Sequence, residues 1–360
     1  MLFRAGAWRA AAKLCERLLT HAHPVDVLLH LRWYHIVALL RIRDVAKAQQ
    51  EMAVFGDLTS GGWRFECYPA LYPGRSGSMV PFALRMLHAL LPSYAGNHDQ
   101  ALTRLYALLN SETSLRLSDS SVPWPVGRVQ IVLALVNVLC TVHDYPNAIA
   151  HLEQLIHALP QQRRAEATPA DSLGSSAYPA RLPGPLPDEM DETSHAMRNA
   201  PYPTMVQLLS LLGRLQLQLG NVHAADDAFG RLECLIPVPE EVTHVRTNRG
   251  LHAMAVLQYP LALVEFQAAL ALEPGSVLAA NNAAVCQLYC SQLDGSVSTL
   301  EGALHTDPHA SMHPALIANL VNLYQMTCNG PSTSAKSTLE RLVASTADQD
   351  FDMSLLNLGQ

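Results

Sequence analysis

The stretch VQLLSLLGRLQLQLGNVHAADDAFGRLECLIP at residues 206–237 is the first of three copies of one pattern. The others are THVRTNRGLHAMAVLQYPLALVEFQAALALEP at 243–274 and VLAANNAAVCQLYCSQLDGSVSTLEGALHTDP at 277–308. The pattern's four positions are Gly213, Ala225, Phe229 and Pro237, then Gly250, Ala262, Phe266 and Pro274, then Ala284, Ser296, Leu300 and Pro308. Within each copy the steps are 12, 4 and 8 residues, and the copies are offset by 37 and 34. A period near 34 with these residues is typical of tetratricopeptide repeats.

The residue types suit two antiparallel helices joined by a short turn. Small residues such as Gly213 and Ala225 are expected where the helices cross, because bulk would hold them apart. Phe229 and Phe266 lie one turn further along the same face and should fill the space against the neighbouring repeat. The prolines should stop each second helix, since proline cannot continue the hydrogen-bond ladder. Because one hairpin cannot bury its apolar face alone, we predict an all-α solenoid of tetratricopeptide-like hairpins, wound as a right-handed superhelix.

Composition supports a helical protein and argues against several classes. Of 360 residues, 49% are hydrophobic and 15% charged, and strand signals are sparse. The net charge is −7 and no basic run exceeds two residues, so nucleic acid is not an expected partner. The longest nearly apolar stretch, 131–142, is too short to span a bilayer. Seven cysteines without a Cys-x-x-Cys motif indicate reduced thiols in the cytosol.

Four regions are expected along the chain. They are an N-terminal helical-repeat half (1–160), a disordered Pro/Ser-rich acidic insertion (161–200), C-terminal tetratricopeptide repeats (201–346) and a helical cap or tail (347–360). In the first half we expect a helix at 5–20 and helix pairs at 25–42 with 45–55, 80–93 with 99–109, and 126–142 with 147–159. A last pair should span 314–326 and 334–343. Two alternatives stay open: a mitochondrial presequence at the start, and an ordered subdomain in place of the insertion.

Residues 56–78 differ from the rest of the N-terminal half. Glycine and proline are too dense there for a regular helix, yet Trp63, Phe65, Tyr68 and Tyr72 need somewhere to be buried. We expect an ordered, packed loop. Its segment 73–78, PGRSGS, has the look of a phosphate loop but lacks the Gly-Lys-Ser/Thr ending.

No set of residues points to catalysis. His305, His309 and His313 recur every four residues, but prolines at 308 and 314 interrupt any helix there. Cys286 and Cys290, one helical turn apart, suit packing better than redox chemistry. We therefore predict no catalytic residue, no metal site, no cofactor and no enzyme activity.

Without a catalytic site, the exposed surface of the repeats is the remaining candidate for function. The first helices of successive hairpins should line a groove for partners, with these exposed positions: Gln207, Ser210, Arg214, Leu217 and Gln218, then His244, Thr247, Leu251 and Met254, then Leu278, Asn281, Val285 and Leu288. Solvent exposure or repeat packing is the alternative role for each. Ser210 and Leu278 stand where a receptor for chaperone tails would need lysines, so that class is disfavoured.

Two stretches resemble one known family. YPALYPGRSGSMVPF at 68–82 is similar to the marker segment of subunit 12 of the TRAPP (transport protein particle) complex, and NNAAVCQLY at 281–289 is similar to a second segment. Residues 6–11 and 96–97 also fit. The marker loop residues are Tyr68, Pro69, Tyr72, Pro73, Gly74 and Arg75. Members of the family carry a long polar region before the repeats, whereas the given sequence starts almost at the first expected helix, and the Pro-rich insertion is unlike the family pattern.

The resemblance implies a non-catalytic scaffold subunit of a TRAPP III-like complex, which tethers vesicles and exchanges nucleotide on a Rab GTPase. It implies roles in endoplasmic reticulum to Golgi transport and in autophagy. The implied partners are the large accessory subunits and the small-subunit core, with membrane contact only through the complex. The implied location is cytoplasmic, peripheral at intermediate-compartment and Golgi membranes. Two other hypotheses are a standalone peptide-binding adaptor and an enzyme hidden in the 56–78 loop.

Overall fold

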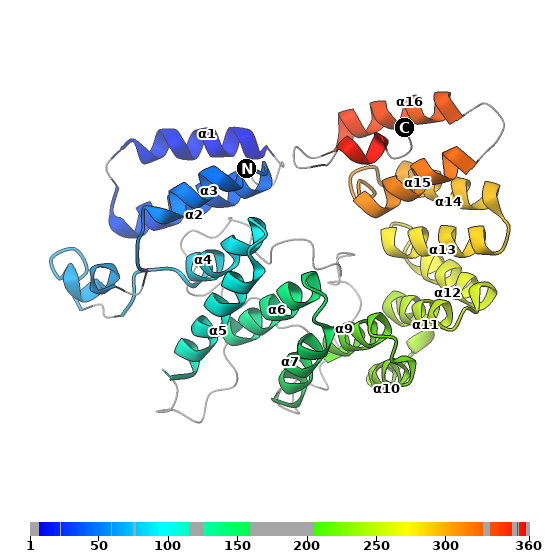
Figure 1. Ribbon diagram of the computed structural model, residues 1–360, viewed down its shortest axis with the longest axis horizontal. Coiled ribbons are helices and arrows are strands. Elements are labelled where there is room, and N and C mark those ends of the chain that lie inside the picture. The colour runs from blue at the N-terminus through cyan, green and yellow to red at the C-terminus, as the bar shows by residue number, and fades with distance from the viewer. Residues whose placement is uncertain are drawn as a thin grey trace. The chain divides into compact units, whose positions relative to one another are not determined.

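The computed structural model describes residues 7–21, 23–58, 60–74, 77–114, 126–158, 205–326, 332–347, 351 and 353–357. Across these residues every regular element is helical, apart from one isolated bridge between Arg64 and Ser78 (Figure 1). The described residues up to His151 belong to one compact unit and those from Leu152 onward to another. The predicted insertion at 161–200, Arg75 and half of the C-terminal cap lie outside the described residues.

The first unit is a series of helical hairpins. Its elements are α1 (Trp8–Leu19), α2 (Val25–Arg41), α3 (Val45–Ala53), η1 (Gly61–Trp63), η2 (Phe65–Cys67), α4 (Phe82–Tyr94), α5 (His98–Ser114), α6 (Val126–Thr141) and the beginning of α7 (Tyr145–Ala158). Each helix packs against its successor in the pairs α1 with α2, α2 with α3, and α4 with α5, and α5 also packs on α6. The helix positions agree with the sequence pattern to within a few residues.

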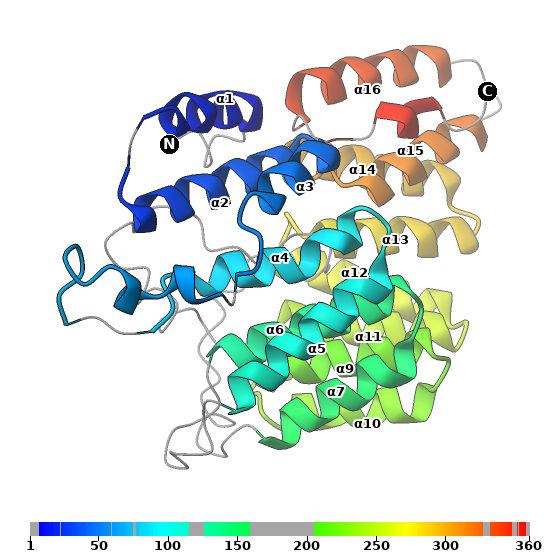
Figure 2. The ribbon, with the colours of Figure 1, turned by 60° about the vertical axis from the view of Figure 1, so that its left-hand side comes forward.

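The second unit repeats the same arrangement. Its elements are α9 (Met205–Gln218), α10 (Val222–Glu233), η5 (Pro239–Glu241), α11 (Thr243–Ala255), α12 (Tyr259–Leu272), α13 (Val277–Tyr289), α14 (Leu293–Thr306), α15 (Pro314–Met326), α16 (Ser332–Thr346) and η6 (Met353–Asn357). From α9 to α16 each helix packs on the next, and first helices also contact the first helices of adjacent hairpins (Figures 1 and 2). The predicted all-α hairpin solenoid is confirmed.

Six of the hairpin turns share one backbone conformation. Each of six turns holds one residue in the left-handed region, with φ between 61° and 82°; these are Arg43, Gly96, His143, Gly220, Leu257 and Ser291. The next residue is Asp or Asn in the first four turns, and its side-chain oxygen accepts the backbone N–H three residues further on. The left-handed residue ends the first helix and the Asp or Asn caps the second, so a few residues reverse the chain.

Close approach of the two helices depends on a missing side chain. A Cβ added to Gly213 would lie 2.2 Å from Cε1 of Phe229, and one added to Gly250 would lie 2.7 Å from Cε1 of Phe266. In the third repeat Ala284 shares a buried cluster with the smaller Leu300. The methyl group that Ala284 adds to the first helix is thus accommodated because Leu300, on the second helix, is smaller than phenylalanine.

The aromatic ring also reaches the next repeat, as the sequence predicted. Phe266 lies in one buried cluster with Ala279, Ala283 and Cys286 of α13. The small residue of the second helix, Ala225, Ala262 or Ser296, is buried in all three repeats. Ser296 also donates its hydroxyl to the carbonyl of Ala284 at 2.7 Å. The helices α10, α12 and α14 end at Glu233, Leu272 and Thr306, before the predicted prolines at 237, 274 and 308. The prolines follow the helix ends and exclude any continuation.

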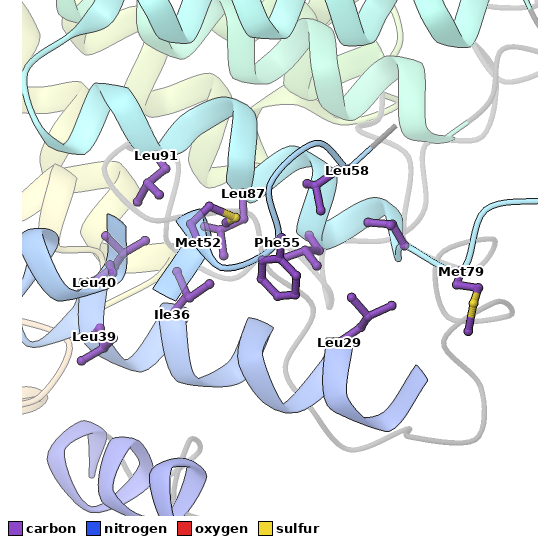
Figure 3. Packing of buried hydrophobic residues seen from close by; sticks show 13 residues of the cluster. Leu29, Ile36, Leu39, Leu40, Met52, Phe55, Leu58, Met79, Leu87 and Leu91 are labelled. Carbon is purple, nitrogen blue, oxygen red and sulfur yellow. The ribbon is translucent and has the colours of Figure 1, made fainter. Parts of the chain in front are cut away.

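The 56–78 segment packs against the core of the first unit. That core joins Leu29, Ile36 and Leu39 of α2 to Met52 and Phe55 near α3 and to residues of α4 (Figure 3). Trp63, Phe65, Tyr68 and Tyr72 are half-buried against it. Among these aromatic residues the backbone forms only the short 3₁₀ turns η1 and η2, because the frequent glycines and prolines interrupt any longer helix.

A buried histidine lies between α1, α2 and α3. Neither ring nitrogen of His35 has a hydrogen-bond partner among the described residues, although Glu16 lies 3.7 Å from Nε2 and Glu51 3.8 Å from Nδ1. Lys47 pairs with the Glu16 carboxylate, and Arg32 pairs with Glu51 at 2.7 Å. Burial lowers the pKa of His35, against the opposing pull of the two carboxylates. The imidazole is therefore neutral near pH 7.

Gly213→Ala should destabilise the second unit. Overpacking costs about 1–3 kcal/mol and exceeds the helix-propensity gain of about 1 kcal/mol, because the buried Phe229 ring must move. Urea unfolding followed by circular dichroism measures the change. Gly230→Ala is the control, since nothing lies within 4 Å of its added Cβ, and it should be neutral or stabilising. Adding Phe229→Leu should rescue Gly213→Ala; equal stability of the two alanine variants would contradict the packing.

The neutral His35 predicts a pH dependence of stability. In the unfolded chain an imidazole takes up a proton near pH 6.5, whereas the folded chain resists protonation. The unfolded state therefore binds more protons, and the stability present above about pH 6.5 declines as the pH falls toward the folded pKa. In His35→Leu the melting temperature should vary less between pH 7.5 and pH 5.5 than in the wild type. His305→Leu, at an exposed position, should keep the wild-type pH dependence. An unchanged pH profile in His35→Leu would refute this account.

Candidate protein-interaction surfaces

The predicted groove residues lie on the first helices α9, α11 and α13, with mixed exposure. Gln207 and Gln218 are exposed, and nine are half-buried: Arg214, Leu217, His244, Leu251, Met254, Leu278, Asn281, Val285 and Leu288. Ser210 and Thr247 are buried. The expectation that these two side chains are exposed is wrong, because adjacent first helices pack on each other over them.

Ser210 and Thr247 form bonds inside the protein. The hydroxyl of Ser210 lies 3.0–3.1 Å from both amide atoms of Asn248, a buried residue of the next first helix. Arg214 Nε donates to Oδ1 of the same Asn248 at 3.0 Å. Thr247 donates its hydroxyl to the carbonyl of Thr243, within α11. Ser210, Arg214 and Asn248 thus join α9 to α11, whereas the Thr247 hydroxyl bonds only within its own helix.

Asparagine recurs at one place in successive first helices. Asn248, Asn282 and Asn319 each come five residues after the start of α11, α13 and α15. Asn319 Nδ2 donates to Oδ1 of Asn281 at 2.8 Å, which links α15 to α13 as Asn248 links α11 to α9. The sequence analysis missed Asn248 and Asn319. Their constant distance from the start of the helix was the signal available.

The charges on and near these first helices are largely paired. Arg249 of α11 binds Glu233 through two hydrogen bonds of 2.8 Å, and Arg246 binds Glu265 at 3.0 Å. Burial, helped by the nearby Arg214, lowers the pKa of His244. The imidazole is therefore neutral near pH 7. A face of half-buried apolar side chains with paired cations suits protein contacts better than an acidic ligand.

The marker loop is held rigidly at its base. Phe65 N–H donates to Gly77 O at 3.0 Å and Met79 N–H to Trp63 O at 2.7 Å. The Glu66 carboxylate accepts the N–H of Gly77 at 2.9 Å, which lowers the pKa of Glu66. A phosphate at this turn would have to displace that carboxylate, so the geometry does not favour a phosphate site.

A long-range bond and an aromatic contact anchor the rest of the loop. Tyr72 donates its hydroxyl to Asp26 of α2 at 2.8 Å, and its ring meets Phe65 edge-on. Pro69, Leu71, Pro73 and Gly74 are exposed. Figure 2 shows the segment projecting beyond the first turn of α4. The sequence analysis missed Asp26 and Glu66, because their partners lie 46 and 11 residues away.

Searches of the described residues for two other features gave negative results. No three His, Cys, Asp or Glu side chains there are placed to hold a metal ion together. Among the described helices, none combines the length and apolar character needed to cross a membrane.

Curated proteins similar to this chain point to one family. Trafficking protein particle complex subunit 12 of Mus musculus is 27% identical over 386 residues, covering 98% of this chain and 43% of that protein. The Homo sapiens protein of the same name is 27% identical over 387 residues, covering 98% of this chain and 46% of its own length. The resemblance to subunit 12 is confirmed. The chain spans less than half the length of these relatives, and no family model matches it.

A solved structure supports the fold. The crystal structure of Ypp1 aligns with 92% of this chain and 38% of its own chain, with a TM-score of 0.51 and 13% sequence identity. At that identity the likeness concerns the fold alone.

Asn248→Ala should separate the structural role of the asparagines from a ligand-binding role. The substitution removes the acceptor of Arg214 Nε and the partner of the buried Ser210, at a cost of about 1–3 kcal/mol. Asn282→Ala is the matched control, because its amide donates only to the carbonyl of Leu278 in its own helix. It should cost less than about 1 kcal/mol. Urea unfolding measures both, and equal losses would show that Asn248 does not tie α9 to α11.

Proposed function

We propose that this chain is a non-catalytic scaffold subunit of a TRAPP III-like vesicle-tethering complex. The observation that carries the proposal is similarity over 98% of the chain to subunit 12 of the trafficking protein particle complex in two mammals. The scaffold role is supported by the fold, because stacked hairpins expose a large surface relative to their core and bind through extended faces.

The proposed partners are the large accessory subunits and the small-subunit core. Nucleotide exchange on a Rab GTPase is assigned to those other subunits, so this chain acts through contacts. The proposed processes are endoplasmic reticulum to Golgi transport and autophagy. The proposed location is cytoplasmic, with peripheral attachment at intermediate-compartment and Golgi membranes through the complex.

A standalone peptide-binding adaptor is the second candidate. It is favoured by one observation, the half-buried apolar side chains Leu217, Leu251, Met254, Val285 and Leu288 on first helices. An amphipathic peptide could dock on such a face. The two functions differ in the size of the particle that contains the chain.

Affinity purification of the tagged chain from cells distinguishes these functions. We expect mass spectrometry to identify the large accessory subunits and the small core, and size exclusion to place the chain in one large particle with them. A tag-only line is the control for carry-over. Recovery of neither set of subunits rules out the scaffold proposal, and a monomer that binds short peptides would establish the adaptor.

A further inference from the structure

An apolar stripe is exposed on α12 and on the turn before it. Leu257 is 70% exposed, Leu261 50% and Val264 58%, and Pro260 and Leu272 are exposed as well. The opposite face of α12, with Ala262, Leu263, Phe266 and Ala269, is buried in the solenoid. The spacing of the exposed residues places them on one side of the helix over roughly 20 Å. This side faces away from α11 and α13.

The other repeats show that the fold does not require this stripe. The positions of Leu257, Pro260, Leu261 and Val264 are occupied by Gly220, His223, Ala224 and Asp227 in the preceding repeat. In the following repeat they are Ser291, Asp294, Gly295 and Ser298. Both neighbours form the same hairpin with small or polar residues there. The four apolar residues at 257–264 therefore serve something outside the hairpin.

Leu257 is unfavourable for the isolated chain in two ways. Its φ of 61° lies in the left-handed region, which a bulky side chain enters at a cost and which glycine occupies freely in the preceding repeat. Its side chain is also the most exposed large apolar one among the described residues. The backbone conformation belongs to the turn, since Arg43, His143 and Ser291 share it, but the large exposed apolar side chain at this position favours a contact outside the chain.

The stripe carries no charge. Glu265 is the only Asp, Glu, Lys, Arg or His among residues 257–272, and it forms an ion pair with Arg246. At the start of α12, Tyr259 stacks on Tyr289 of α13, with centroids 4.2 Å apart and planes 3° from parallel. Tyr289 is 63% exposed, but this pair lies on the side of α12 that packs on α13 and is separate from the stripe.

We propose that this α12 stripe, formed by Leu257, Pro260, Leu261, Val264 and Leu272, seats the uncharged apolar face of a helix from another subunit of the complex. The inference rests on the proposed function. A helix fits because the stripe is straight and its residues recur at helical spacing. The exposed apolar area is on the order of a few hundred Å², below the roughly 800 Å² per partner that a stable pair needs. It therefore suits one contact among several in a larger assembly, not a dimer of this chain.

The test replaces the stripe with residues of the preceding repeat. The triple variant Leu257→Gly, Leu261→Ala and Val264→Asp should keep or raise the melting temperature, because Gly220, Ala224 and Asp227 occupy those positions in a folded hairpin. Its co-purification with the TRAPP subunits should fall at least about tenfold. Ser298→Asp, the matching change on α14, should leave co-purification unchanged. Recovery of the triple variant at the wild-type level overturns the inference.

Crosslinking and light scattering test the stripe independently of the triple variant's co-purification. A photo-crosslinking residue at position 261 should form a bond to a TRAPP subunit, and one at position 298 should not, which gives a result even if the triple variant misfolds. Light scattering that shows a wild-type dimer abolished by the triple variant would assign the stripe to a second copy and overturn the inference. Wild-type chain that recovers no TRAPP subunit would instead refute the proposed function.

Discussion

The structure depends on a steric match between the two helices of each hairpin. An aromatic ring on the second helix occupies the space that a side chain on the first helix would need, as Phe229 does over Gly213. This lets the backbones approach closely and leaves the ring almost completely buried. Where the first helix carries a methyl group, at Ala284, the second carries Leu300 instead of phenylalanine. The volume of each pair is conserved although its residues are not.

Because successive hairpins repeat this match and pack on one another, they form a solenoid. Phe266 closes its own hairpin and also packs on Ala279 and Ala283 of the next, so one side chain serves two interfaces. Adjacent first helices are further tied by amide side chains, through Asn248 to Ser210 and Asn319 to Asn281. The Asn248 bond is buried and the Asn319 bond is half-buried, and side-chain bonds shielded from water in this way are costly to break and help fix the register between repeats. Apolar packing supplies the stability, and these amides select one arrangement.

The proposed function rests on the surfaces that the hairpins leave uncovered. The marker loop is anchored by Tyr72 to Asp26 and presents Pro69, Leu71 and Pro73 outward. The α12 stripe presents apolar side chains that the adjacent repeats lack. Preorganised surfaces lose little entropy on binding, so a small area can still contribute usefully when several subunits assemble.

The amino-acid sequence by itself determined the helices, the hairpin pairing and the small and aromatic positions such as Gly250 and Phe266. These follow from short-range spacing, since side chains three or four residues apart share a helix face. Only the tertiary structure decided which of those positions meet solvent. Ser210 is buried because Asn248, 38 residues later, lies against it. In sequence α12 is apolar on all sides, and only the packing of α11 and α13 shows that Leu261 and Val264 remain uncovered, because burial is a property of neighbours distant in the chain.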